Sequence, residues 1–107
     1  MPNFQTICQI HDVPEGSARM YVVGKELVGI FHVEGQFFAL DNRCPHAGAS
    51  LAHGIVEGDE VACRIHHWRF SIRDGRRLDE SCPGTNARCF PLRIVDQDVQ
   101  IDLGQPG

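Results

Sequence analysis

The 107-residue sequence has no long apolar run, and no hydrophobic stretch approaches the roughly 20 residues that a membrane-spanning helix needs. The first ten residues, MPNFQTICQI, lack a basic segment followed by an apolar one, so a signal peptide is not expected. We therefore expect a cytoplasmic protein with no membrane partner. Hydrophobic residues make up 42% and charged residues 22% of the chain, which excludes a disordered or collagen-like protein. The length fits one domain and is too short for separate catalytic and cofactor domains.

Basic residues are in the minority. The chain has 10 Lys and Arg against 14 Asp and Glu, for a net charge of −4. Because a protein that binds duplex nucleic acid is usually basic, we expect no nucleic-acid partner. All the basic residues except Lys25 are arginines, and most of them lie between Arg43 and Arg93. This uneven placement is open to two interpretations, solvated loop charge or a basic rim around a site in that segment.

A helical period is also missing, since no segment of ten or more residues repeats its apolar positions every 3.6 residues. Short runs rich in Val, Ile, Phe and Tyr alternate instead with Gly, Pro and Asp turn signals, a pattern that predicts strands. The predicted strands are Phe4–Ile10, Arg19–Val23, Glu26–Val33, Gln36–Leu40, Glu60–Cys63, His67–Ile72, Arg88–Val95 and Val99–Leu103. This spacing predicts an all-β fold, a small antiparallel barrel or sandwich.

The five cysteines are an odd number, which argues against a complete disulfide framework in a chain without an export signal. Cys82 and Cys89 are close enough in sequence to form a disulfide. The simpler interpretation is that Cys8, Cys82 and Cys89 are reduced thiols. The other two cysteines, Cys44 and Cys63, each stand beside a histidine.

These two pairs have the spacing of metal ligands. The first is Cys44-Pro45-His46 and the second is Cys63-Arg64-Ile65-His66, and each lies in a loop at a strand end. Two such loops can present two thiolates and two imidazoles to one metal centre. That ligand set suits zinc or an iron–sulfur cluster, and the number of ligands does not separate the two.

The residues around the pairs resemble the Rieske [2Fe–2S] family. The first loop reads CPHAGASL, the second reads CRIHHWRF, and Cys82-Pro83-Gly84 stands where relatives carry a proline-bearing loop. The resemblance implies one [2Fe–2S] cluster per chain, with Cys44 and Cys63 on one iron and His46 and His66 on the other. It also implies a single domain over residues 1–107, in which about residues 41–84 form a two-loop cluster-binding subdomain.

By this resemblance the chain is a one-electron carrier, a Rieske-type ferredoxin and not an enzyme. It would pass electrons from a flavin-dependent reductase to a terminal oxygenase or reductase, as a monomer that docks weakly. Two alternatives stay open, a small Rieske-like subunit of an assimilatory nitrite reductase and a zinc-stabilised interaction module. Arg43 and Arg64, beside the ligands, are candidates for contact with an acidic partner surface.

One residue departs from the family pattern. Relatives with an aromatic residue after the second loop often have glycine directly after the ligand histidine, where this chain has His67. Family spacing favours His66 as the ligand and leaves His67 as its neighbour. We interpret His53 as a surface or hydrogen-bonded histidine, and Trp68 and Phe70 as core packing below the cluster.

Overall fold

The computed structural model describes residues 3–43, 50–64, 67–79 and 86–103. The strands are β1 (Phe4–Gln9), β2 (Ser17–Val23), β3 (Glu26–Val33), β4 (Gln36–Asp41), β5 (Ile55–Glu57), β6 (Glu60–Ala62), β7 (Arg69–Ser71), β8 (Cys89–Phe90), β9 (Leu92–Val95) and β10 (Asp98–Asp102). Two 3-10 turns, η1 (Ile10–Asp12) and η2 (Leu51–His53), are the helical elements of these residues. Neither turn has the length or hydrophobicity to span a bilayer. The prediction of an all-β fold is confirmed.

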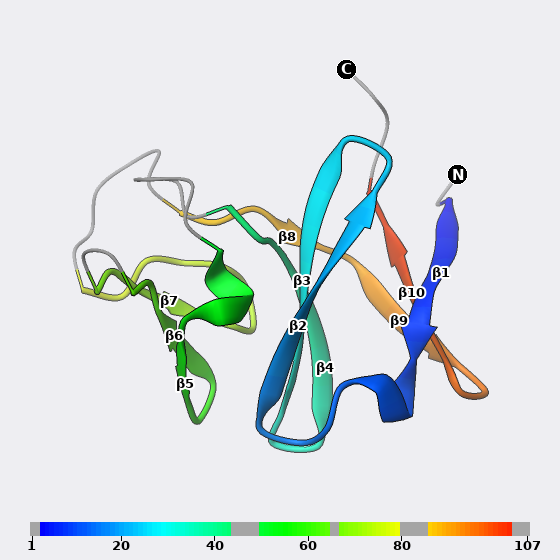
Figure 1. The fold of residues 1–107 in the computed structure, drawn as a ribbon, viewed down its shortest axis with the longest axis horizontal. Coiled ribbons are helices and arrows are strands. Elements are labelled where there is room, and N and C mark those ends of the chain that lie inside the picture. The colour runs from blue at the N-terminus through cyan, green and yellow to red at the C-terminus, as the bar shows by residue number, and fades with distance from the viewer. Residues whose placement is uncertain (1–2, 44–49, 65–66, 80–85, 104–107) are drawn as a thin grey trace.

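The strands form three antiparallel sheets (Figure 1). The central sheet has the order β2-β3-β4-β8, and in the view of Figure 1 it stands between the other two. One outer sheet, β1-β10-β9, pairs the first strand of the chain with the last. The other outer sheet, β5-β6-β7, follows the first predicted ligand loop and carries the second between β6 and β7.

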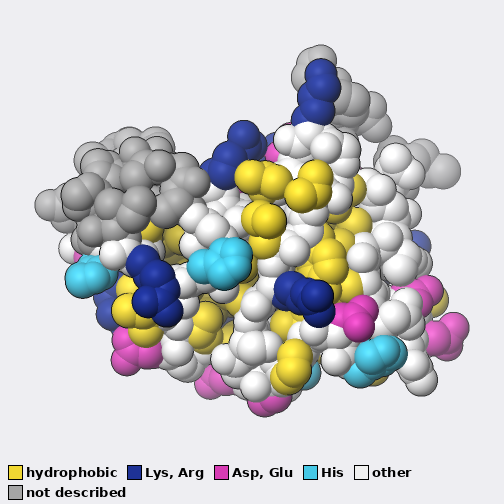
Figure 2. Space-filling view, in the orientation of Figure 1, with side chains coloured by type: hydrophobic (Ala, Val, Ile, Leu, Met, Phe, Trp, Pro, Cys, Tyr) yellow, Lys and Arg dark blue, Asp and Glu magenta, His cyan; other side chains and the backbone are white. Residues whose placement is uncertain are grey.

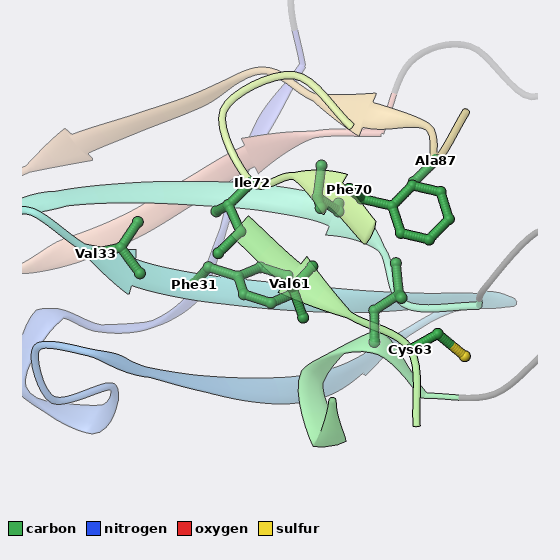
Figure 3. Close-up of a cluster of buried hydrophobic side chains, with 9 residues drawn as sticks. Phe31, Val33, Val61, Cys63, Phe70, Ile72 and Ala87 are labelled. Atoms are coloured by element: carbon green, nitrogen blue, oxygen red, sulfur yellow. The ribbon is translucent and has the colours of Figure 1, made fainter. Parts of the chain in front are cut away.

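Strand β3 is buried on both faces and divides the core in two. Because successive side chains of a strand point to opposite faces, Val28 and Ile30 pack with the β1-β10-β9 sheet, whereas Phe31 and Val33 pack with β5-β6-β7. Figure 3 shows the second cluster, in which Phe31 lies against Val61 of β6. Full burial of one such side chain stabilises the fold by about 1.5–3 kcal/mol. This second cluster therefore anchors the small sheet, and with it the second ligand loop, to the central sheet.

Most strand ends differ from the sequence prediction by one or two residues, and two differences are larger. The predicted strand Arg88–Val95 is divided at Pro91 into β8, which pairs with β4, and β9, which pairs with β10. Proline has no N–H to donate to a strand ladder, so the chain changes sheets there. The short strand β5 was missed, because three residues are too few to show an alternating pattern, and it pairs with β6 across a turn containing Gly58.

Candidate metal centre

Of the four predicted ligands, Cys63 lies within the described residues, and Cys44, His46 and His66 lie outside them. Cys63 directly follows β6, and only 1% of its surface is exposed. Its sulfur lies at the end of the buried cluster that is farthest from Val33 (Figure 3). The neighbouring side chains of this cluster therefore hold the Cys63 thiol in place and screen it from water.

The backbone on either side of Cys63 is closed into a tight loop. The Cys63 N–H donates to the Trp68 carbonyl oxygen over 2.8 Å, and the Cys63 carbonyl oxygen accepts from the His67 N–H, also over 2.8 Å. These two bonds join Cys63 to the two residues that follow the Cys-x-x-His segment. Backbone hydrogen bonds therefore hold together the described residues on the two sides of the loop that carries the second predicted pair.

His67 closes this loop in a left-handed backbone conformation, with φ at 58°. That region suits glycine, because a Cβ atom there crowds the following carbonyl oxygen. The observation gives a physical reason for the glycine that relatives often have at this place. It also shows that His67 is accommodated in the loop at a conformational cost, with its side chain exposed.

Replacing His67 by glycine is expected to raise the free energy of unfolding by up to about 1 kcal/mol, because it removes the left-handed strain. The matched control is His11→Gly in the exposed turn η1, where added backbone freedom should lower stability by about 0.5–1 kcal/mol. Urea unfolding of both variants and of the parent protein measures the difference. Equal destabilisation by the two substitutions would show that the loop gains nothing from glycine at position 67.

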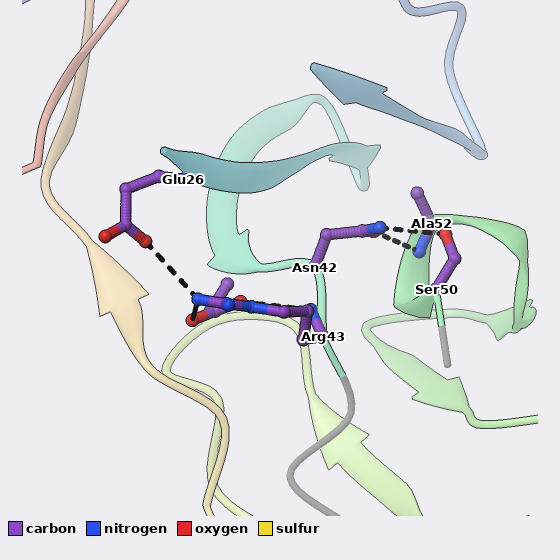
Figure 4. Close-up of polar contacts among 6 residues, drawn as sticks. Glu26, Asn42, Arg43, Ser50 and Ala52 are labelled. Atoms are coloured by element: carbon purple, nitrogen blue, oxygen red, sulfur yellow. Dashed lines mark hydrogen bonds and ion pairs between the residues drawn. The ribbon is translucent and has the colours of Figure 1, made fainter. Parts of the chain in front are cut away.

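The two ends of the first ligand loop are held together by a buried amide. Arg43 and Ser50 form an antiparallel bridge, and next to it Asn42 is only 1% exposed. Figure 4 shows the Asn42 side chain pointing at Ser50 and Ala52. Its Nδ2 donates to Ser50 Oγ over 2.8 Å, and its Oδ1 accepts from the Ala52 N–H over 2.8 Å. One buried side chain therefore closes the ring of backbone that contains the first predicted pair.

Contacts of His53 join the two loops. The hydroxyl oxygen Oγ of Ser50 lies 2.6 Å from His53 Nδ1, and the guanidinium Nε of Arg64 donates to the His53 carbonyl oxygen. Beneath them, Leu51 and Cys63 belong to the same buried cluster. The prediction of His53 as a hydrogen-bonded surface residue is confirmed. Ser50, which ends the first loop, and Arg64, which follows Cys63, therefore both contact His53.

Ion pairs neutralise much of the arginine-rich segment. Carboxylates hydrogen-bond to the guanidinium groups of Arg43, Arg69 and Arg73 and raise their pKa above the usual value. On the face shown in Figure 2 the basic side chains are scattered, with no single basic patch. The ion pairs are Arg43 with Asp41 and Glu26, Arg69 with Glu57 and Glu60, Arg73 with Glu34 and Asp59, and Arg77 with Asp79.

Beyond the predicted ligands, Asn42 and Arg77 shape the site and were missed from sequence. Trp68 packs against the buried cluster and Phe70 lies within it, so the prediction that both contribute to the core is confirmed. Asn42 lies two residues before Cys44, but a polar residue at a strand end carries no signal that its side chain turns inward. Arg77 was counted among loop charges, although it is buried.

A comparison with known protein families identifies the family of this chain. The model of the Rieske [2Fe–2S] domain matches residues 3–91. This chain belongs to the Rieske [2Fe–2S] family. The family predicted from the two Cys/His loops is therefore confirmed, and so is the [2Fe–2S] cluster as its cofactor.

Relatives of this Rieske chain are ferredoxins of dioxygenase systems. The ferredoxin component of the naphthalene 1,2-dioxygenase system of Pseudomonas aeruginosa is 40% identical over 88% of this chain and 89% of the relative. The biphenyl dioxygenase ferredoxin subunit of Pseudomonas sp. (strain KKS102) is 33% identical over 95% of this chain and 94% of the relative. These relatives confirm the prediction of an electron carrier that is not itself an enzyme.

Solved structures agree. The ferredoxin of Sphingomonas yanoikuyae B1 superposes with a TM-score of 0.86 at 30% identity, over 97% of this chain and 100% of that one. A chain from the complex of reduced oxygenase and oxidised ferredoxin in carbazole 1,9a-dioxygenase gives a TM-score of 0.81 at 27% identity, over 92% of both chains.

The described part of this Rieske chain fits the cluster. A Rieske cluster takes two cysteine and two histidine ligands. Cys63 supplies a buried thiol, and the hydrogen bonds of Asn42 and of Cys63 close the two loops that carry the remaining Cys and His residues. His53 and Arg64 tie those loops to each other, as a cluster shared between them requires.

Proposed function

We propose that this chain is the ferredoxin component of a multicomponent dioxygenase system. It accepts single electrons from a flavin-dependent reductase and delivers them to the terminal oxygenase. The observation that carries the proposal is the 40% identity, across 88% of the chain, to the ferredoxin component of a naphthalene dioxygenase system. We propose that it works as a monomer in the cytoplasm.

The ligand assignment within this proposal follows the two loops. Cys44 and Cys63 hold one iron, and His46 and His66 hold the other, within about residues 41–84 of a single Rieske domain over residues 1–107. The bound cluster supplies a reversible one-electron acceptor. The protein contributes the buried thiol of Cys63, the closed backbone of both loops and a core that keeps water from one side of the site.

Metal analysis tests this proposal directly. Protein purified without air should contain about two irons and two acid-labile sulfides per chain. It should also accept one electron per chain in a titration with reductant, and pass that electron to the oxygenase component of a naphthalene dioxygenase system. One zinc per chain without sulfide would overturn the proposal and identify a zinc-stabilised module.

Arg64 gives a test of how the carrier meets its oxygenase. Its side chain is exposed, it lies within the second predicted ligand loop, and it forms no ion pair with the described residues. Arg64→Glu is expected to slow electron transfer to the oxygenase about tenfold at low salt, and much less at high salt, because charged docking surfaces steer association. Stopped-flow oxidation of the reduced carrier measures the rate.

The matched control for Arg64 is Arg93→Glu on β9. Arg93 lies over the ring of Phe4 and bonds Gln100, in the sheet on the opposite side of the central sheet. Its substitution makes the same change in net charge and should leave the rate within about twofold. If the two variants slow transfer equally, the effect comes from overall charge and Arg64 has no part in docking.

A further inference from the structure

Arg77 is a buried, positively charged residue beside the β5-β6-β7 sheet. Its side chain is 5% exposed, and its Cζ atom lies 3.3 Å from the centroid of the Trp68 ring, so that the guanidinium stacks on the indole face. A buried charge is costly unless it is paired and hydrogen-bonded. The contacts of Arg77 must therefore be well formed, and they identify the residues that Arg77 keeps in position.

The guanidinium of Arg77 makes a two-pronged pair with Asp79. Nε donates to Oδ1 and Nη2 donates to Oδ2, each over 3.0 Å, and this pairing holds the pKa of Asp79 below its usual range. The same Oδ1 accepts from the backbone N–H of Arg69, over 3.1 Å. The backbone N–H of Arg77 donates to Asn86 Oδ1 over 2.9 Å. Arg77 therefore contacts Asp79 and Asn86, on either side of the segment 80–85, and also Trp68, whose carbonyl oxygen accepts from Cys63.

Trp68 connects this pair to the proposed ligand. Its carbonyl oxygen accepts the N–H of Cys63, and its ring packs against the buried cluster that contains Cys63. A displacement of the Trp68 ring must therefore move the backbone that positions the Cys63 sulfur. Only an arginine has the planar shape to stack on the ring and to pair with both carboxylate oxygens of Asp79 at once.

We propose that Arg77 is a positioning residue for the second ligand loop, which it holds in place by stacking on Trp68 and pairing with Asp79. The role rests on the proposed function, because it concerns Cys63 as a cluster ligand. Residues that orient metal ligands through a second contact typically change metal affinity 10- to 100-fold when they are replaced. Loss of Arg77 should therefore loosen the cluster without removing any ligand.

The charges give the proposal a second, independent readout. Arg77→Met leaves the carboxylate of Asp79 unpaired, so a negative charge should disfavour the reduced cluster and lower its potential. Asp79→Asn removes the negative charge beside the guanidinium and should raise the potential. Both substitutions break the two-pronged pair, so both should speed cluster loss. A purely electrostatic role would move the potentials in opposite directions and leave cluster retention unchanged.

The experiment compares Arg77→Met, Arg77→Lys and Asp79→Asn with the control Arg76→Met, an exposed neighbour whose side chain makes no ion pair with the described residues. The rate at which an iron chelator bleaches the visible absorption measures cluster retention, and a redox titration measures the potential. We expect about tenfold faster bleaching for Arg77→Met. Arg77→Lys, which keeps the charge but cannot stack, should bleach faster while its potential stays near that of the parent. Arg76→Met should stay within twofold on both measures.

Two failures can be told apart. Bleaching of Arg77→Met, Arg77→Lys and Asp79→Asn at the rate of Arg76→Met would overturn the role of Arg77 and leave the proposed function intact. A parent protein with zinc and no sulfide would overturn the proposed function before any variant is compared. If Arg77→Met does not fold, Arg77→Lys and Asp79→Asn carry the same comparison.

Discussion

Replacing Cys63 by alanine is expected to lower the iron content from about two atoms per chain to nearly none, with loss of the visible absorption. Cys63 is the one proposed ligand that the structure describes, and its thiol is buried at the end of β6. Without that thiolate one iron has an incomplete ligand set, and no other cysteine of the described residues belongs to this buried cluster. Metal analysis and absorption spectra of protein purified without air measure the result.

The matched control is Cys89→Ala. Cys89 is a free, exposed cysteine on β8 and lies outside the buried cluster that contains Cys63; partial desolvation of its thiol, together with the charge of Asp74, raises its pKa. It should therefore keep the full iron and sulfide content after substitution. Cys63→Ser, which keeps nearly the same shape, separates loss of the ligand from loss of packing. Full iron content in Cys63→Ala would mean that Cys63 is a core residue and that the ligand set lies elsewhere.

The parts of the site and fold that follow a recognisable sequence pattern could be predicted. The Cys/His pairs are such a pattern, and so is β3, whose run of apolar residues marks a strand buried on both faces. Asn42 and Arg77 follow no pattern, because their roles depend on irregular loops that fold back and bring against them residues up to ten positions away in the sequence. From sequence alone an arginine is expected to be a solvent-exposed charge, because contacts such as those of Arg77 with Trp68 and Asp79 become visible only in the structure. Contacts across irregular loops are hard to predict from one sequence, because these loops have no periodic pattern that shows which way a side chain turns.

The region of the ligand loops also depends on close contact between two backbone segments. In the turn after β7, Gly75 makes such a contact with Ala87. Gly75 has φ at +79°, and a Cβ atom built there would lie 2.2 Å from the carbonyl oxygen of Ala87. The Gly75 carbonyl oxygen accepts from the Ala87 N–H over 2.8 Å, so the two backbones are in direct contact. Ala87 belongs to the same buried cluster as Cys63 and cannot move outward freely.

Gly75→Ala is therefore expected to destabilise the protein by about 3 kcal/mol or more, the sum of left-handed strain and the displacement of a buried segment. The control is Gly16→Ala, where φ is +81° and nothing lies within 4 Å of the added Cβ. There the strain acts alone and should cost about 1 kcal/mol. Urea unfolding of both variants measures the difference. Equal losses would show that the contact with Ala87 yields without cost. A larger loss at Gly75, together with faster bleaching of the cluster, would show that the contact with Ala87 supports the Cys63 end of the core.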